Sequence, residues 1–127
     1  MREILFRGKF DNEWKYGFLS TGPNGLVIKE RYSDDKSGVW HIDSRTIGQY
    51  TGMLDKNGIK IFEGDIIDFP DRSDGDGYGV VRYDENETEF EFEYDNIYRS
   101  LGSYYPKNIE VIGNIYDNPE LLKGALE

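Results

Sequence analysis

"TGMLDKNGIKIFEGDII", residues 51–67, combines two tight turns with two short apolar runs. Its Asn-Gly pair tolerates the left-handed conformations of a tight hairpin, and the Glu-Gly-Asp that follows is a second sharp turn. The runs "IKIF" and "IIDF" have the length of short strands, and Pro70 ends the second because proline cannot continue a hydrogen-bonded ladder. The stretch therefore predicts a small antiparallel sheet with sharp reversals.

Four carboxylates accompany these turns and raise the question of an acidic site: Asp55, Glu63, Asp65 and Asp68. Acid–base catalysis by two carboxyl groups needs them close together, with one pKa raised. Glu63 and Asp65 instead bracket a glycine, where an aspartate typically bonds to the backbone amides of its own turn. We expect a structural role here and no catalytic residue.

Period-two alternation extends over most of the chain, with turn-forming residues between the apolar segments. It is clearest in "GVVRYDENETEFEFEY", a predicted hairpin whose second arm places three aromatic side chains on one face: Phe90, Phe92 and Tyr94. The opposite face carries three glutamates, which we expect to be solvated: Glu89, Glu91 and Glu93. Because like charges repel on one strand, this row is a candidate interaction surface for a partner rich in Lys or Arg, or for another copy of the chain.

The chain ends with a helix signal. Asn118 suits an N-cap and Pro119 the first helical position, with leucines following as an apolar anchor. The expected fold class is mainly β, an antiparallel meander of eight or nine short strands with one short C-terminal helix. A length of 127 residues fits a single domain, 1–127, with candidate lobes at 1–50 and 51–127.

Composition excludes several classes of function. The chain has no cysteine, so thiolate nucleophiles and thiolate metal sites are absent. Its formal charge of −10 repels a phosphate backbone unless basic residues are segregated, so nucleic acid is a disfavoured partner. We find no apolar run long enough to span a bilayer, and the charged first seventeen residues are unlike a signal peptide. The cytoplasm is the expected location.

Residues 74–85 match part of a calcium-binding EF-hand loop, with Asp74, Asp76 and Glu85 in ligand positions. Strand signals rather than helices flank this loop, which favours a solvated hairpin loop without metal. His41 is the only histidine and is expected on the surface if Trp40 faces the core. A single histidine excludes a multi-histidine metal site. We therefore expect no metal ion and no cofactor.

Exposed aromatic side chains can stack on nucleobases. The sequence offers five at Trp14, Tyr16, Phe18, Tyr104 and Tyr105. The interleaved Lys and Arg that such a surface needs are missing, so core packing is the favoured interpretation.

Three segments together resemble the YopX family of phage and prophage proteins: "REILFRGKFDNEWKYGFL", "IGQYTGMLDKNGIKIFEGDII" and "IEVIGNIYDNPELL". They occur in the order found in that family and cover the chain from near residue 2 to residue 122. The resemblance implies a phage-encoded, mostly β protein that acts in a bacterial cytoplasm and self-associates. It implies no catalytic, cofactor-binding or metal-binding residue.

Within this resemblance, four positions are expected to be the turns at which a small barrel-like sheet changes direction: Gly52, Gly58, Gly64 and Asp65. The Glu-Gly-Asp turn is similar to one in SH3-like barrels, which is an analogy of fold and not of function.

The favoured function is a non-enzymatic protein-binding or assembly module, whose partner is another protein or a second copy of the chain. One alternative is an acidic mimic of nucleic acid that inhibits a host DNA-binding protein, motivated by the charge of −10. A second is a small nucleic-acid-binding β-barrel, which requires a basic face hidden in the average charge.

Overall fold

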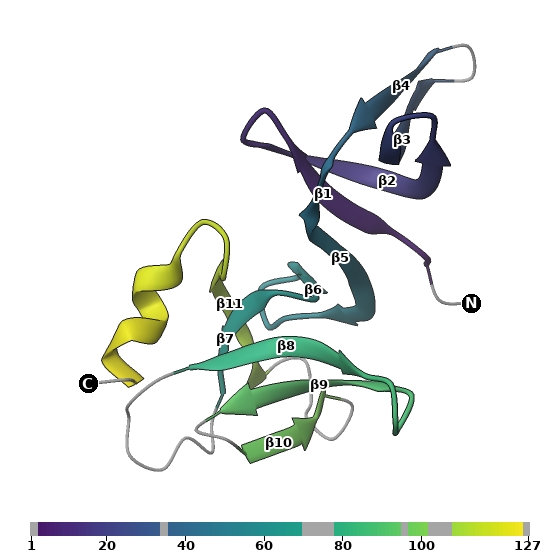
Figure 1. Ribbon diagram of the computed structural model, residues 1–127. Coiled ribbons are helices and arrows are strands. Elements are labelled where there is room, and N and C mark those ends of the chain that lie inside the picture. Colours follow the sequence, from purple (N-terminus) through teal and green to yellow (C-terminus); the bar gives the residue numbers. More distant parts are fainter. Residues whose placement is uncertain (1–2, 34–35, 70–77, 95–96, 102–107, 126–127) are drawn as a thin grey trace. The chain divides into compact units, whose positions relative to one another are not determined.

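Antiparallel strands make up most of the structure, a computed structural model (Figure 1). It describes residues 3–33, 36–69, 78–94, 97–101 and 108–125. The chain divides into an N-terminal unit, Met1–Tyr50, and a C-terminal unit, Thr51–Glu127. The described residues contain eleven strands, so the prediction of a mainly β, antiparallel fold is confirmed.

A meander forms the N-terminal unit, and its strands are β1 (Phe6–Phe10), β2 (Glu13–Gly22), β3 (Gly25–Ser33), β4 (Lys36–His41) and the first part of β5 (Asp43–Leu54). Their order is β4-β3-β2-β1-β5, so β5 returns to pair with β1. Asp11 and Asn12 form the turn from β1 to β2 with φ of 51° and 67°. Aspartate and asparagine tolerate these left-handed values, which match the twist of a tight hairpin.

Two glycines allow close packing on one face of this sheet. A Cβ atom on Gly17 would lie 2.1 Å from the carbonyl oxygen of Lys29, and one on Gly8 would lie 2.6 Å from Cδ1 of Ile42. Ile28 and Ile42 are buried on the same face, with 0% and 9% of their surface exposed. The absence of side chains at the two glycines therefore lets the neighbouring backbone and isoleucines fill this space.

The C-terminal unit contains a five-stranded sheet in the order β10-β9-β8-β7-β11. Its strands are β7 (Asp65–Asp68), β8 (Gly79–Asp84), β9 (Glu89–Tyr94), β10 (Ile97–Ser100) and β11 (Glu110–Asn114). The short strand β6 (Lys60–Phe62) precedes them and pairs with β5. The hydrophobic core of the unit is one cluster of buried side chains: Ile61, Ile67, Phe69, Val81, Phe92, Tyr94, Leu101 and Ile109.

The sheet of the C-terminal unit is open in the described residues and does not close into the expected barrel. Strands β10 and β11 form its two edges, with three strands between them, so the pairing that closure requires is not made. The turn before β7 that is similar to SH3-like barrels is therefore a local feature.

The predicted C-terminal helix is a 3-10 helix, η3 (Pro119–Ala125), which begins at the predicted proline. At seven residues it is longer than the usual 3-10 helix, which rarely exceeds about four residues because its hydrogen bonds are less favourable than those of an α-helix. The side-chain Oδ1 of Asn118 accepts a hydrogen bond of 3.2 Å from the backbone N–H of Asn114. Gly113 makes room, because a Cβ there would lie 2.6 Å from that oxygen. Asn118 thus ties the start of the helix to β11.

Within the described ranges, no helix is both long and apolar enough to cross a membrane.

Candidate functional site

The glutamate row predicted as an interaction surface lies on β9, between β8 and β10. Glu89 is exposed and Glu93 is half-buried, but only 6% of Glu91 is exposed. The expectation that all three are solvated is therefore wrong for Glu91. Because β9 is an inner strand, its middle has a neighbour on either side, and Arg82 of β8 reaches to the Glu91 carboxylate.

Arg82 on β8 supplies the counter-charge to this row. Its Nε lies 3.2 Å from Oε1 of Glu91, and its Nη1 lies 3.7 Å from Oε1 of Glu93. On the other side, the hydroxyl of Tyr98 donates to Glu93 over 3.4 Å, and that of Ser100 donates to Glu89 over 3.2 Å. The Arg82 guanidinium also lies 5.1 Å from the ring centroid of Tyr98.

Burial raises the pKa of Glu91 above the ordinary value, and the nearby carboxylate of Asp84 raises it further. Arg82 opposes both effects, while the neighbouring glutamates add to the repulsion. The sheet itself therefore provides a cation of the kind that the sequence led us to expect from a partner, and two hydroxyl donors in addition.

Two carboxylates of residues 51–67, Asp55 and Asp65, accept hydrogen bonds from the backbone. Asp55, 4% exposed, accepts hydrogen bonds through Oδ1 from the N–H groups of Asn57 and Ile59, at 2.8 and 2.9 Å. Its Oδ2 accepts another from Val111 on β11, at 2.9 Å. Asp65, 2% exposed, accepts one from Phe62 at 2.7 Å, a local bond across its own turn. These two side chains therefore fix turns rather than face a substrate.

The three glycines of this stretch have positive φ: 89° at Gly52, 81° at Gly58 and 89° at Gly64. Such values are strained for other residues, so glycine is what lets the chain reverse at these points. Gly64 also donates a backbone hydrogen bond of 2.8 Å to Val81 and accepts one of 2.9 Å from Ile115. It therefore links three segments of the C-terminal unit.

His41 and the candidate calcium loop form no site in the described residues. His41 is exposed at the end of β4, as expected, and Trp40 is half-buried. Asp74, Asp76, Tyr104 and Tyr105 lie outside the residues that the structure describes. In the described ranges, no three histidine or carboxylate side chains are grouped so as to hold a metal ion.

The sequence offered Trp14, Tyr16 and Phe18 as possible stacking rings but favoured core packing, which is wrong for Tyr16 and Phe18, with 40% and 65% of their surface exposed. All three belong to a surface on the N-terminal unit, on the side of the sheet opposite Ile28. We call it the aromatic–basic face, and it comprises Arg7, Lys9, Trp14, Tyr16, Phe18, Lys29 and Val39. Cross-strand pairs place these side chains together, because directly paired residues project to the same face of a sheet. The pairs are Arg7 with Tyr16, Lys9 with Trp14, Phe18 with Lys29, and Lys29 with Val39.

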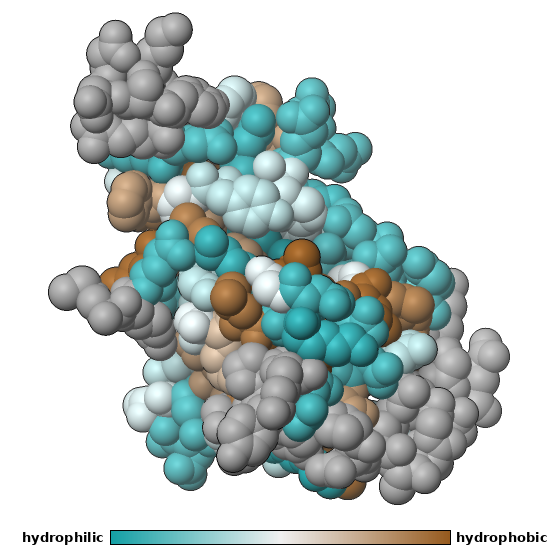
Figure 2. Space-filling model, turned by 180° about the vertical axis from the view of Figure 1, so that it is seen from behind, coloured by the Kyte–Doolittle hydropathy of each residue, from teal (hydrophilic) through white to brown (hydrophobic). Residues whose placement is uncertain are grey.

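The aromatic–basic face exposes large apolar side chains. The exposed fractions are 65% for Phe18, 55% for Val39 and 40% for Tyr16, and Lys29 between two of them is exposed as well. Figure 2 shows more generally that hydrophobic and hydrophilic patches are interspersed on the face of the molecule it displays. A monomer gains nothing from exposing such a group of side chains, which makes it a candidate for binding.

Cations lie against the innermost ring of this face. The guanidinium of Arg7 is 4.5 Å and the ammonium of Lys9 is 5.2 Å from the ring centroid of Trp14. These are cation–π distances, so Trp14 packs against both cations. Only 6% of Arg7 is exposed, so the half-buried Lys9 is the one of the two that a partner can reach.

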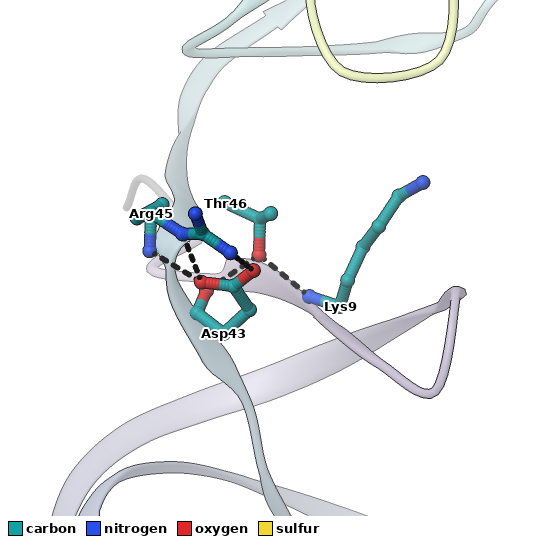
Figure 3. Close-up of polar contacts among 4 residues, drawn as sticks. All are labelled: Lys9, Asp43, Arg45 and Thr46. Carbon is teal, nitrogen blue, oxygen red and sulfur yellow. Dashed lines mark hydrogen bonds and ion pairs between the residues drawn. The ribbon is translucent and has the colours of Figure 1, made fainter.

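The Lys9 side chain lies against Trp14 and not against its cross-strand partner on β5, the acidic Asp43 (Figure 3). Arg45 binds the Asp43 carboxylate through two nitrogens, at 3.0 and 2.9 Å, and its hydrogen bonds hold the pKa of Asp43 below the ordinary value. Thr46 accepts a hydrogen bond from the backbone N–H of Lys9 at 2.9 Å. In Figure 3 the Lys9 side chain extends away from all three residues.

The net charge is distributed very unequally between the two units. The N-terminal unit has eight Lys and Arg against seven Asp and Glu, a net charge of +1. The C-terminal unit has seven against eighteen, a net charge of −11, which together give the −10 of the whole chain. The average therefore conceals a unit without acidic excess.

The sequence did contain a signal for this face. A two-residue turn at Asp11 and Asn12 fixes the register of β1 against β2, and with it the pairing of Lys9 with Trp14. The interleaving of cations and aromatics runs across strands rather than along the sequence, which is why a linear search does not find it.

Comparison with known proteins identifies relatives. The model of the family described as YopX protein matches residues 7–123. The crystal structure of protein EF1440 from Enterococcus faecalis is similar with a TM-score of 0.57 and 25% identity, over 96% of this chain and 99% of that chain. That of protein yopX from Bacillus subtilis is similar with a TM-score of 0.61 and 22% identity, over 93% and 97%. No curated protein matches.

Proposed function

The chain belongs to the YopX family, and on that premise we propose that it is a phage-encoded, non-enzymatic binding module that acts in the bacterial cytoplasm by contacting another macromolecule. The observation that carries this proposal is the aromatic–basic face, where Phe18 and Val39 are more than half exposed on either side of Lys29. Exposed aromatic side chains beside cations are typical of binding surfaces, because each combines apolar contact area with a directed charge.

The glutamate row on β9 supports this proposal less well. Its charges are compensated within the sheet by Arg82 and by the hydroxyl groups of β10. A basic partner would first have to displace Arg82 from Glu91 and Glu93, and the free energy of breaking these ion pairs reduces the net free energy of binding.

Site-specific photocrosslinking tests the proposal. The photoreactive residue p-benzoylphenylalanine replaces Val39, 55% exposed, in the full chain, and the protein is irradiated in a bacterial lysate. The matched control carries the same residue in place of Tyr98, which is 52% exposed and lies on the C-terminal unit. We expect a discrete crosslinked product from position 39 that is absent from position 98 and is lost when Phe18→Ala is added. No product from position 39, or equal products from both positions, would refute the proposal.

A second candidate function is favoured by the charge of the C-terminal unit, eighteen acidic against seven basic residues. Such a unit is suited to imitate nucleic acid and block a basic host protein. This candidate predicts salt-sensitive capture of a host DNA-binding protein that the Phe18→Ala variant retains. Capture that disappears with Phe18→Ala would exclude it.

A further inference from the structure

We infer that the aromatic–basic face binds single-stranded DNA. This inference rests on the proposed function, since it names the partner of the same face. Proteins that bind single strands without sequence preference combine exposed aromatic rings, on which bases stack, with cations that follow the phosphates. The face presents both groups on adjacent strands, with Tyr16 and Phe18 on β2 and Lys29 beside them on β3.

The spacing of the rings favours a single strand over a duplex. Tyr16 and Phe18 are two residues apart on one strand, so their positions are separated by about 7 Å. Bases in a duplex are stacked at about 3.4 Å along each strand, half that separation. Successive bases can therefore reach successive rings only when their mutual stacking is broken, as in an extended single strand.

The cations are placed to meet the phosphates. Lys29 on β3 lies between its cross-strand neighbours Phe18 on β2 and Val39 on β4. Lys9 on β1 is paired with Trp14 on β2. The carboxylate that faces Lys9 across the strands, Asp43, is bound by Arg45. Among the described strand residues of β1 to β4 on this face, none is acidic.

The overall charge of −10 does not preclude this contact. At 0.1 M salt the Debye length is about 10 Å, so charges farther away are largely screened and the local charge decides. The N-terminal unit as a whole has a net charge of +1. The average of −10 therefore does not describe the aromatic–basic face, which carries Lys9 and Lys29.

DNA suits the face better than RNA. The group that distinguishes RNA is the 2′-hydroxyl, which proteins recognise with hydrogen-bonding side chains. Phe18 and Val39, both more than half exposed, have no such group. Phe18 offers a ring for base stacking and Val39 an apolar contact, and a strand without 2′-hydroxyls can make both contacts.

Binding is tested with the full chain and a fluorescently labelled fifteen-nucleotide oligothymidylate, by fluorescence anisotropy. We expect a Kd of about 10⁻⁴ to 10⁻⁶ M, the range of non-specific binding. Two lysines that each neutralise one phosphate give a slope of log K against log salt of about −1.4, so that affinity falls about sevenfold between 50 and 200 mM salt. A duplex of the same length and an oligouridylate serve as competing ligands.

Two pairs of variants test the assignment to the face. Phe18→Ala removes a stacking ring and is expected to weaken binding at least about fivefold, while Tyr98→Ala on the C-terminal unit leaves it unchanged. Lys29→Glu is expected to weaken binding and to reduce the salt slope by about 0.7, while Lys60→Glu, with the same change in net charge, leaves both unchanged. Circular dichroism verifies that each variant is folded.

The outcomes separate this inference from the proposed function. Failure to bind the oligothymidylate at 50 mM salt, equal loss in the paired control variants, or tighter binding of the duplex or the oligouridylate would overturn it. If position 39 crosslinks to a protein instead, or Phe18→Ala abolishes a dimer detected by light scattering, the binding module stands and single-stranded DNA is refuted. A nuclease-sensitive crosslink at position 39 supports both.

Discussion

Asp55 is expected to be the most consequential carboxylate of the C-terminal unit, because its side chain joins the turn at residues 55–59 to β11. Only 4% of it is exposed, and it accepts three backbone hydrogen bonds of 2.8 to 2.9 Å. The backbone adds a further link, as the N–H of Lys56 donates to the carbonyl of Ile109 at 2.9 Å. Replacement of Asp55 by alanine and by asparagine separates its contributions.

The expected magnitudes follow from the number of bonds lost. A hydrogen bond to a charged group contributes about 1.5–3 kcal/mol. Asp55→Ala removes three such bonds and is expected to lower the free energy of unfolding by about 4–5 kcal/mol, taking the lower figure for each. Asp55→Asn can keep the two bonds within the turn through its one oxygen. It then sets its NH₂ group against the N–H of Val111, for a loss of about 2–3 kcal/mol.

Urea unfolding followed by far-UV circular dichroism measures these losses, and amide hydrogen exchange at Val111 gives the local readout. A loss of 2–3 kcal/mol in Asp55→Asn corresponds to exchange about 30 to 160 times faster at that amide. Glu87→Gln is the matched control, since Glu87 is exposed and its substitution should change stability by less than about 0.5 kcal/mol. If Asp55→Asn left both readouts unchanged, Asp55 would not hold β11 as described.

Three further predictions follow from single contacts. The pKa of Glu91 is raised in the folded state, so its contribution to stability is full below the unfolded pKa and is lost as pH rises through the raised value. Because Gln resembles the protonated carboxyl at every pH, the urea midpoint of Glu91→Gln relative to that of the unsubstituted chain should be higher at about pH 7 than at about pH 4, and no change between the two would contradict the raised pKa. Gly17→Ala should cost about 3 kcal/mol or more, because its Cβ would meet the carbonyl oxygen of Lys29 at 2.1 Å; tryptophan fluorescence in urea measures the loss, and an unchanged midpoint would contradict the close approach. Arg45→Ala should return the lowered pKa of Asp43 toward its ordinary value in an NMR titration, and an unchanged pKa would mean that Arg45 is not the cause.

Local chemistry made much of the fold predictable. The alternation in "EFEFEY" predicts a strand with Phe92 and Tyr94 inside, and both are buried. The helix signal at Pro119 marks the first residue of η3. These predictions depend on neighbours in sequence, for which period and turn chemistry are sufficient.

Pairing between distant segments was the part that the sequence did not reveal. Glu91 alternates like a surface residue, yet it is buried because β9 lies between β8 and β10 and Arg82 reaches over it. Barrel closure was expected from a turn, but strand order decides it, and β10 and β11 are at opposite edges.

The sequence by itself determined the tight turns and the clearly alternating strands such as β9, because these properties depend on residues a few positions apart. Only the tertiary structure decided which strands are neighbours. That choice brings Lys9 to Trp14 and Lys29 to Phe18, and leaves the acidic excess in the other unit. The physical reason is that a binding surface is made of cross-strand neighbours, whose proximity depends on sheet register and not on their distance along the chain.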